Sequence, residues 1–145
     1  MADKDHTELI RLKDTDLMVA GGEADVRGRT AVDRNGEEIG QVDDLFIDSD
    51  EQKVRFLELG SGGFLGIGEK KSLIPVDAVA RVEEDKVVID HDRTRIADAP
   101  AYDPELKEAP DRGYYESLYG YYGYAPYWAP GYMYPRYPYR GMDQR

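Results

Sequence analysis

The chain has 145 residues, of which 30 are acidic and 19 basic, with two histidines and no cysteine, and its formal net charge is −11 at pH 7. The lack of cysteine excludes disulfides, thiol catalysis and zinc sites built on thiolates, and the negative charge argues against general binding to the phosphate backbone of nucleic acids. No apolar run approaches the roughly 18 residues of a membrane helix and no N-terminal signal peptide is readable, so we expect a cytoplasmic protein.

The composition divides the chain into two regions. All 12 tyrosines lie at or after Tyr102, and 11 of them fall between Tyr114 and Tyr139. Residues 1–99 carry 24 acidic and 14 basic groups, a net charge of −10, whereas residues 100–145 carry 6 and 5, a net charge of −1. These shifts predict an N-terminal arm over 1–25, a folded domain over 26–99, a linker over 100–113 and a Tyr/Pro/Gly-rich tail over 114–145.

The first part of the chain favours β-structure. Leu9, Ile10 and Leu12 predict a short strand or packing arm. The runs 26–33 and 38–48 flank Asn35-Gly36, the strongest short-range signal for a β-hairpin because both residues tolerate a positive φ. The apolar spacing in the second run slips near Gly40, which predicts a β-bulge.

Further strands are expected at 53–60, 72–76, 80–83 and 86–90, which gives the pattern of a small all-β barrel or sandwich. Asp92 predicts the N-cap of a short helix that ends before Pro100. From spacing within the strands, the predicted core contains Ile39, Val42, Leu45, Ile47, Val54, Phe56, Leu57, Leu73, Ile74, Val87 and Ile89.

Several short segments follow one another in an order that is typical of a known family. They are Asn35-Gly36-Glu37, IGQVDD from Ile39, VRFLE from Val54, the FLGIG loop, and LIPV from Leu73. In this order they resemble the PRC-barrel domain over roughly residues 26–92. That domain is shared by the cytoplasmic part of the photosynthetic reaction-centre H subunit, the C-terminal half of a ribosome maturation factor, and many small stand-alone bacterial proteins.

The resemblance implies a small PRC-like β-barrel with an N-terminal arm and a C-terminal extension. We expect a non-catalytic interaction or scaffold module of the stand-alone bacterial type, forming a homodimer and recruiting an unidentified protein partner through its aromatic tail. One alternative is an H-subunit-like partner that associates peripherally with a membrane electron-transfer complex and assists proton transfer. Another is an RNA- or ribosome-assembly-associated factor.

The glycine-rich stretch from Gly62 to Gly68 does not predict a nucleotide site, because Glu69 stands where a phosphate loop has its lysine and a strand follows instead of a helix. Three apolar residues in this loop, Phe64, Leu65 and Ile67, form a candidate contact surface. The alternative interpretation is an ordinary glycine-rich connection between strands.

Acidic residues crowd the region that follows the first hairpin: Asp43, Asp44, Asp48, Asp50 and Glu51. A calcium loop counted from Asp48 would require glycine and glutamate where the chain has Lys53 and Leu59. We therefore expect a solvated strand edge protected by charge, with no metal and no other cofactor.

His91 lies between Asp90 and Asp92, and two neighbouring carboxylates are expected to raise its pKa. It is thus a candidate proton-transfer group, although a plain surface histidine is the more ordinary interpretation. No serine or second histidine is placed for a catalytic triad, and we expect no enzyme activity.

The tail offers the most unusual chemistry. Tyrosine combines a large apolar ring with a hydroxyl that seeks a partner, as at adaptable interfaces. Proline and glycine are expected to prevent a regular helix or strand. The alternatives are a disordered low-complexity tail, docking on the chain's own barrel or a partner's, and stacking on single-stranded nucleic acid. If it docks, the expected contacts are Tyr119, Tyr122, Tyr124 and Trp128.

Overall fold

The structure is a computed structural model, which describes residues 9–12, 25–49, 51–60, 71–100, 112–135 and 137. In chain order its elements are β1 (Leu9–Arg11), β2 (Thr30–Val32), β3 (Glu38–Asp48), β4 (Val54–Gly60), β5 (Lys71–Pro75), the 3₁₀ helix η4 (Val76–Ala78), β6 (Val79–Val82), β7 (Lys86–Ile89), α1 (Arg93–Ala97) and α2 (Arg112–Tyr122). Strands dominate, so the predicted all-β class is confirmed.

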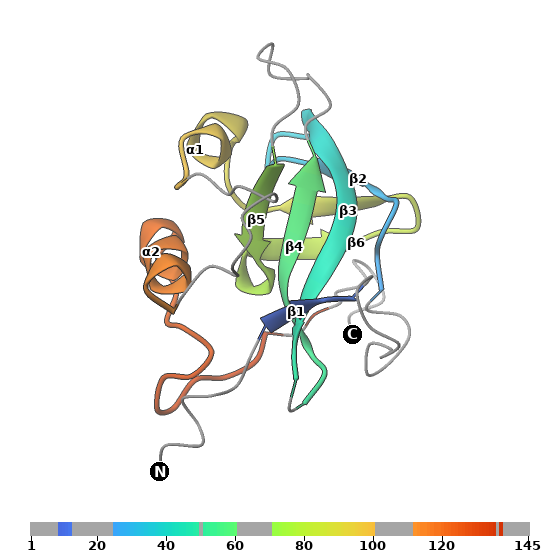
Figure 1. The fold of residues 1–145 in the computed structure, drawn as a ribbon. Coiled ribbons are helices and arrows are strands. Elements are labelled where there is room, and N and C mark those ends of the chain that lie inside the picture. The colour runs from blue at the N-terminus through green and yellow to red at the C-terminus, as the bar shows by residue number, and fades with distance from the viewer. Residues whose placement is uncertain are drawn as a thin grey trace.

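The strands form one curled sheet in the order β5-β4-β3-β2-β7-β6, with β1 paired to the end of β3. The pairing of β2 with β7 is parallel and every other pairing is antiparallel. Figure 1 shows β6 and β7 crossing behind β3, β4 and β5, with both helices on the side of β5. Among the described residues no ladder joins β5 to β6, so the sheet is strongly curled but not closed.

The predicted hairpin between β2 and β3 is confirmed, and one buried carboxylate organises its turn. Gly36 has a φ of 86°, which an L side chain rarely adopts. Asp33 accepts hydrogen bonds from the backbone N–H groups of Asn35 and Glu37, at 2.8 and 2.9 Å, and of Arg93, at 2.9 Å. The Asp33 side chain therefore fastens the hairpin to the start of α1. The predicted bulge is present as a register shift opposite Ala31 and Val32.

The predicted core is confirmed. Each of the eleven aliphatic and aromatic residues expected there is buried, with no more than 4% of its surface exposed. The short helix α1 is also confirmed: Asp92 caps it by accepting from the N–H of Arg95 at 2.9 Å, and Ile96 packs into the same core.

The prediction that the tail contains no regular structure is wrong at its start, because α2 runs from Arg112 to Tyr122. Tyr115, Leu118, Tyr119 and Tyr122 are buried, and their spacing of three and four residues places them on one helix face. The helix contains no proline, and glycine in a helix costs only about 1 kcal/mol relative to alanine. Tertiary packing of this face readily outweighs that cost.

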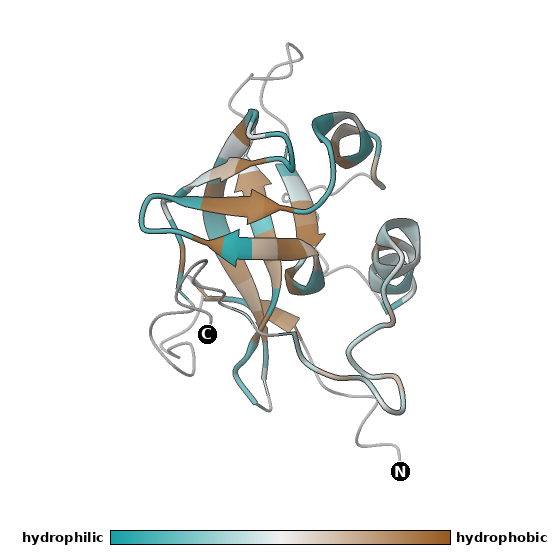
Figure 2. Ribbon diagram, turned by 180° about the vertical axis from the view of Figure 1, so that it is seen from behind, coloured by the Kyte–Doolittle hydropathy of each residue, from teal (hydrophilic) through white to brown (hydrophobic). Residues whose placement is uncertain are grey.

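Hydropathy values conceal this face. In Figure 2 the strands are mostly brown, whereas α2 is nearly colourless. The hydropathy scale rates tyrosine as slightly polar, although a buried tyrosine ring removes as much apolar surface from water as other large aromatic side chains do. The apolar side of α2 is therefore visible in its burial and not in its hydropathy.

Candidate interaction surface

The described tail residues, 112–135 and 137, pack against several elements of the folded body, the part of the chain that ends at Pro100. The first contact is aromatic: the Phe56 ring of β4 lies 5.3 Å from Tyr115 and 5.1 Å from Tyr119, centroid to centroid, in tilted arrangements. Phe56 is fully buried, Tyr119 is 1% exposed and Leu118 is also fully buried. The helix thus shares one continuous hydrophobic core with the sheet.

The end of α2 turns the chain toward a second part of the body. Gly123 has a φ of 90°, and the backbone N–H of Tyr124 donates to the carbonyl of Tyr119 at 2.9 Å. This is the Schellman arrangement, which needs a residue that tolerates the left-handed region directly after the helix. From there the chain continues through turns at Pro126 and Ala129.

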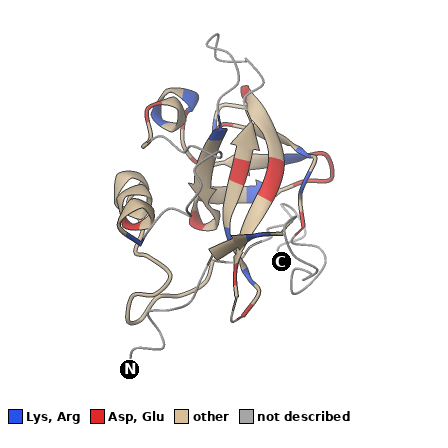
Figure 3. Cartoon of the chain, viewed as in Figure 1, with Lys and Arg blue, Asp and Glu red and all other residues tan. Residues whose placement is uncertain are grey.

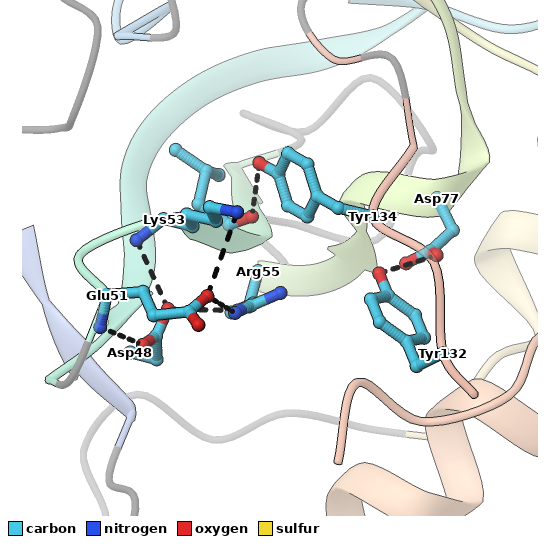
Figure 4. A network of polar contacts seen from close by, with 8 residues as sticks. Asp48, Glu51, Lys53, Arg55, Asp77, Tyr132 and Tyr134 are labelled. Atoms are coloured by element: carbon cyan, nitrogen blue, oxygen red, sulfur yellow. Dashed lines mark hydrogen bonds and ion pairs between the residues drawn. The ribbon is translucent and has the colours of Figure 1, made fainter. Parts of the chain in front are cut away.

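Arg55 of β4 is the centre of the second contact, and Figure 4 shows its surroundings. Its side chain is 6% exposed and its Nε donates to the Asp48 carboxylate at 2.9 Å. Its guanidinium lies 4.4 Å from the ring centroid of Tyr127 and 5.3 Å from that of Tyr134. Burial by itself lowers the pKa of Arg55, but the Asp48 carboxylate more than offsets this and the pKa is raised, so the charge is retained between the rings.

Hydroxyl groups complete this second contact. Tyr134 donates to the carbonyl of Val54 at 2.9 Å, and Tyr132 donates to the Asp77 carboxylate at 2.9 Å. Burial raises the pKa of Asp77 despite the hydrogen bond from Tyr132. The extended segment after α2 is therefore fixed by hydrogen bonds of defined direction as well as by ring packing.

A third contact joins the tail to the end of β7 and to α1. His91 Nε2 lies 3.0 Å from the Tyr124 hydroxyl oxygen, and its ring meets the Tyr122 ring edge-on at 4.9 Å. The Tyr121 hydroxyl donates to the carbonyl of Arg95 at 2.6 Å, while the Arg95 guanidinium donates to the Tyr121 carbonyl and lies 4.5 Å from its ring centroid. Residues 26 to 33 positions apart in sequence are thereby held together.

The expectation that flanking carboxylates raise the pKa of His91 is wrong. Burial is the largest influence and lowers the pKa, and the neighbouring charge of Arg95 lowers it further. Asp90 and Asp92 act in the opposite direction but more weakly. Sequence neighbours on a turn point into solvent, whereas the tail covers the histidine ring, and this tertiary effect decides the outcome.

The expectation of a solvated acidic edge is wrong for two of its members. Asp48 is 1% exposed and organises the turn after β3, since it accepts from the N–H groups of Glu51 and Lys53 as well as from Arg55. Asp44 is fully buried and is paired in register with the buried Glu58 of β4. Figure 3 shows acidic positions side by side on β3 and β4.

Comparison with protein families assigns the body. The family model described as "PRC-barrel domain" matches residues 22–96, just over half of the chain. The chain belongs to the PRC-barrel family. The match ends at Ile96 in α1, so α2 and the segment after it lie outside the PRC-barrel match. This family is in general non-catalytic.

The candidate residues occupy different places relative to the PRC-barrel. Tyr119 and Tyr122 are buried between α2 and the sheet, while Tyr124 and Trp128 are half-buried. The loop residues Phe64, Leu65 and Ile67 and the acidic Asp50 lie outside the described residues.

Sequence reasoning missed the residues of the PRC-barrel that receive the tail: Arg55, Phe56, Asp77, His91 and Arg95, of which Phe56 was assigned only to the core and His91 only to proton transfer. A usable signal was the spacing of Tyr115, Leu118, Tyr119 and Tyr122, which repeats with the helical period. No comparable signal marks Arg55 or Asp77, because single charged residues in strands and turns are ordinary.

The described ranges contain no group of three or more histidine, aspartate or glutamate side chains that could hold a metal ion. None of the helices described here has both the length and the apolar character needed to cross a bilayer.

Proposed function

We propose that this PRC-barrel protein is a non-catalytic interaction module whose binding surface is the outer side of the docked aromatic tail. The observation that carries the proposal is a group of half-buried aromatic rings in the tail. Tyr114, Tyr121, Tyr124, Tyr127, Trp128 and Tyr134 pack against the core with one side and remain partly exposed on the other. Met133 directly precedes Tyr134 in the sequence and is 83% exposed.

Such a surface suits protein recognition for two physical reasons. Tyrosine, tryptophan and methionine are enriched at interfaces because they supply apolar area together with a polar or adaptable end. Rings that are already fixed lose little conformational entropy on binding. The contacts of Tyr121, Tyr127 and Tyr134 with Arg95 and Arg55 hold these rings in place before any partner arrives.

The proposal is tested by site-specific photo-crosslinking in cells. A photoreactive amino acid replaces Met133, and in a matched control it replaces Glu84, which is exposed at the turn between β6 and β7. We expect discrete protein adducts at position 133 and not at position 84. In the purified complex, Met133→Glu is expected to weaken binding at least tenfold, and Glu84→Lys to change it less than twofold.

Equal labelling at both positions, in a chain shown to be folded, would contradict the proposal. It would move the search for a binding surface from the tail to the PRC-barrel itself. A partner that crosslinks at position 133 but binds Met133→Glu with unchanged affinity would also contradict it.

A further inference from the structure

The part of the PRC-barrel beneath the tail has the properties of a receptor site. We define the docking face as Arg55, Phe56, Asp77, His91 and Arg95. Each member meets its own tail residues: Arg55 meets Tyr127 and Tyr134, Phe56 meets Tyr115 and Tyr119, Asp77 meets Tyr132, His91 meets Tyr122 and Tyr124, and Arg95 meets Tyr121.

These contacts do not depend on which chain supplies the tail. The hydrogen bonds join residues 26, 33, 55 and 80 positions apart. The α2 helix meets the sheet through side chains and through no strand ladder that continues the body's backbone. The same segment from a second molecule would therefore find every partner that the chain's own tail finds.

The connection between body and tail is longer than closure within one chain requires. The Tyr114 hydroxyl lies 3.5 Å from the carbonyl oxygen of Pro100, so α2 starts close to the last described residue of the body. Eleven residues, 101–111, separate Pro100 from Arg112, and a chain of that length reaches about 36 Å when extended. This reach permits docking on a neighbouring molecule.

Charge attracts the tail to a body in either pairing. Residues 1–99 carry a net charge of −10, whereas residues 112–145 contain four arginines, one glutamate and one aspartate, a net charge of +2. The tail of one molecule is thus attracted to the body of another as it is to its own, although two bodies repel each other. Salt screens both effects beyond roughly 8 Å at physiological ionic strength.

We infer that the docking face also binds the tail of a second copy of this chain, which gives a dimer with exchanged tails. In this dimer the partner's tyrosines enclose Arg55 and the partner's Phe56 receives the local α2. The inference goes beyond the proposed function, because the docking face lies beneath the tail and is a different surface from the outer side of the tail.

The balance between closed monomer and exchanged dimer follows from effective concentration. Both states contain the same docking contacts, so docking within one chain prevails until the chain concentration approaches the local concentration of the tail, which is in the millimolar range for a short linker. We expect closed monomers at about 10 µM and a substantial exchanged fraction at about 1 mM.

Cysteine crosslinking of full-length chains tests the inference, because the natural chain has no cysteine. Arg95→Cys is placed in one preparation and Tyr121→Cys in another, at a contact between α1 and α2. The two are mixed, unfolded in urea, refolded together at about 1 mM and treated with a short bismaleimide. The control mixes Arg81→Cys, exposed on β6, with Tyr121→Cys. The double variant Arg95→Cys/Tyr121→Cys reports closure within one chain.

Exchange predicts a covalent heterodimer linked between positions 95 and 121, at least fivefold above the control and falling on dilution to about 10 µM. Closure of the double variant together with a heterodimer no stronger than the control would overturn exchange, while crosslinking at position 133 would keep the proposed function. Failure of the double variant to close would overturn the docked arrangement itself.

Discussion

The PRC-barrel and its tail are stabilised by different means. In the PRC-barrel, neighbouring strands share backbone hydrogen bonds, and the core is made mostly of Val, Ile, Leu and Phe. Among the described tail residues, α2 alone satisfies its own backbone regularly, and the segment after it relies on rings and hydroxyl groups that contact individual residues of the PRC-barrel. The first arrangement tolerates exchange of one aliphatic residue for another, whereas the second depends on particular side chains.

The largest expected effect lies where the two regions meet. Phe56→Ala removes a fully buried ring that contacts both the barrel core and α2. We expect a loss of about 3–5 kcal/mol in the free energy of unfolding, measured by urea denaturation. Circular dichroism of the strands and fluorescence of Trp128, the only tryptophan, should give coincident transitions.

Met133→Ala is the matched control for Phe56→Ala, because Met133 is 83% exposed. It should change the free energy of unfolding by less than about 0.5 kcal/mol. Separate transitions for the two probes in the natural chain would break the comparison, since the tail would then not belong to the same cooperative unit.

The next effect concerns Arg55, whose charged side chain contacts both Asp48 of the PRC-barrel and two rings of the tail. Arg55→Met leaves the buried Asp48 carboxylate without its main cation and removes the group between Tyr127 and Tyr134. Loss of one member of a buried pair typically costs about 3 kcal/mol. Arg81→Met, which removes an exposed pair with Glu83, should cost less than about 1 kcal/mol. Equal costs in urea denaturation would show that Arg55 is not the anchor of the tail.

Deleting single hydroxyl groups tests which hydrogen bonds of the tail stabilise the protein. The Tyr132 hydroxyl donates to Asp77, so Tyr132→Phe is expected to cost about 1.5–2 kcal/mol. The Tyr119 hydroxyl is buried and has no hydrogen-bond partner among the described residues, so Tyr119→Phe should be neutral or stabilising. Thermal and urea unfolding of both variants measure the difference, and the reverse order would contradict the described geometry.

Two glycines allow a direct comparison of the regions. Gly36 in the barrel hairpin and Gly123 after α2 have φ values of 86° and 90°, and a Cβ on either meets no atom within 4 Å. Alanine at each position should therefore cost about 1–2 kcal/mol through backbone strain alone.

Gly120→Ala, in an ordinary helical conformation and open space, should instead stabilise by about 0.5–1 kcal/mol. A full cost at Gly36 together with unchanged stability in both the Gly123→Ala and the Gly120→Ala variants would mean that the tail separates from the PRC-barrel before the PRC-barrel unfolds.

The smallest effect is the pH dependence at the third contact. Because the pKa of His91 is lowered in the folded state, the folded protein binds this proton less readily than the unfolded chain does. The stability that depends on neutral His91 is complete above its ordinary pKa of about 6.5 and is lost as the pH falls through the lowered value. His91→Gln should flatten this part of the stability curve, measured by thermal unfolding between pH 7.5 and about 5.

Asp77 acts in the opposite direction at more acidic pH, because its pKa is raised. The protonated form of Asp77 is favoured in the folded state, so this contribution to stability is lost as the pH rises from the ordinary pKa of the carboxyl group through the raised one.

For His91, a stability curve that is unchanged by His91→Gln below pH 6.5 would show that the tail does not cover the histidine.

What the sequence alone determined is the all-β PRC-barrel domain, although its sheet is curled and not closed over the described residues. Alternating apolar residues, the Asn35-Gly36 turn and the Asp92 cap encode strands, a hairpin and α1 through local geometry, and they place Phe56 in the core before any fold is known. The family resemblance rests on the same local signals. The tyrosines of the tail were ambiguous, because the ring favours burial while the hydroxyl is well solvated by water. The nearby prolines also obscured the helical spacing of Tyr115 and Tyr119.

Only the tertiary structure decided which residues of the PRC-barrel contact the tail, and how far side chains are buried and their pKa values shifted. Asp48 and Asp44 looked like solvated charges but are buried, Asp48 against Arg55 of β4 and Asp44 in register with Glu58 of the same strand. Burial lowers the pKa of His91, and the rings of Tyr122 and Tyr124, more than thirty positions away in sequence, pack against this histidine. Desolvation and cation–π contact depend on what surrounds a side chain in three dimensions, and residues so far apart in sequence leave no local pattern that foretells their meeting.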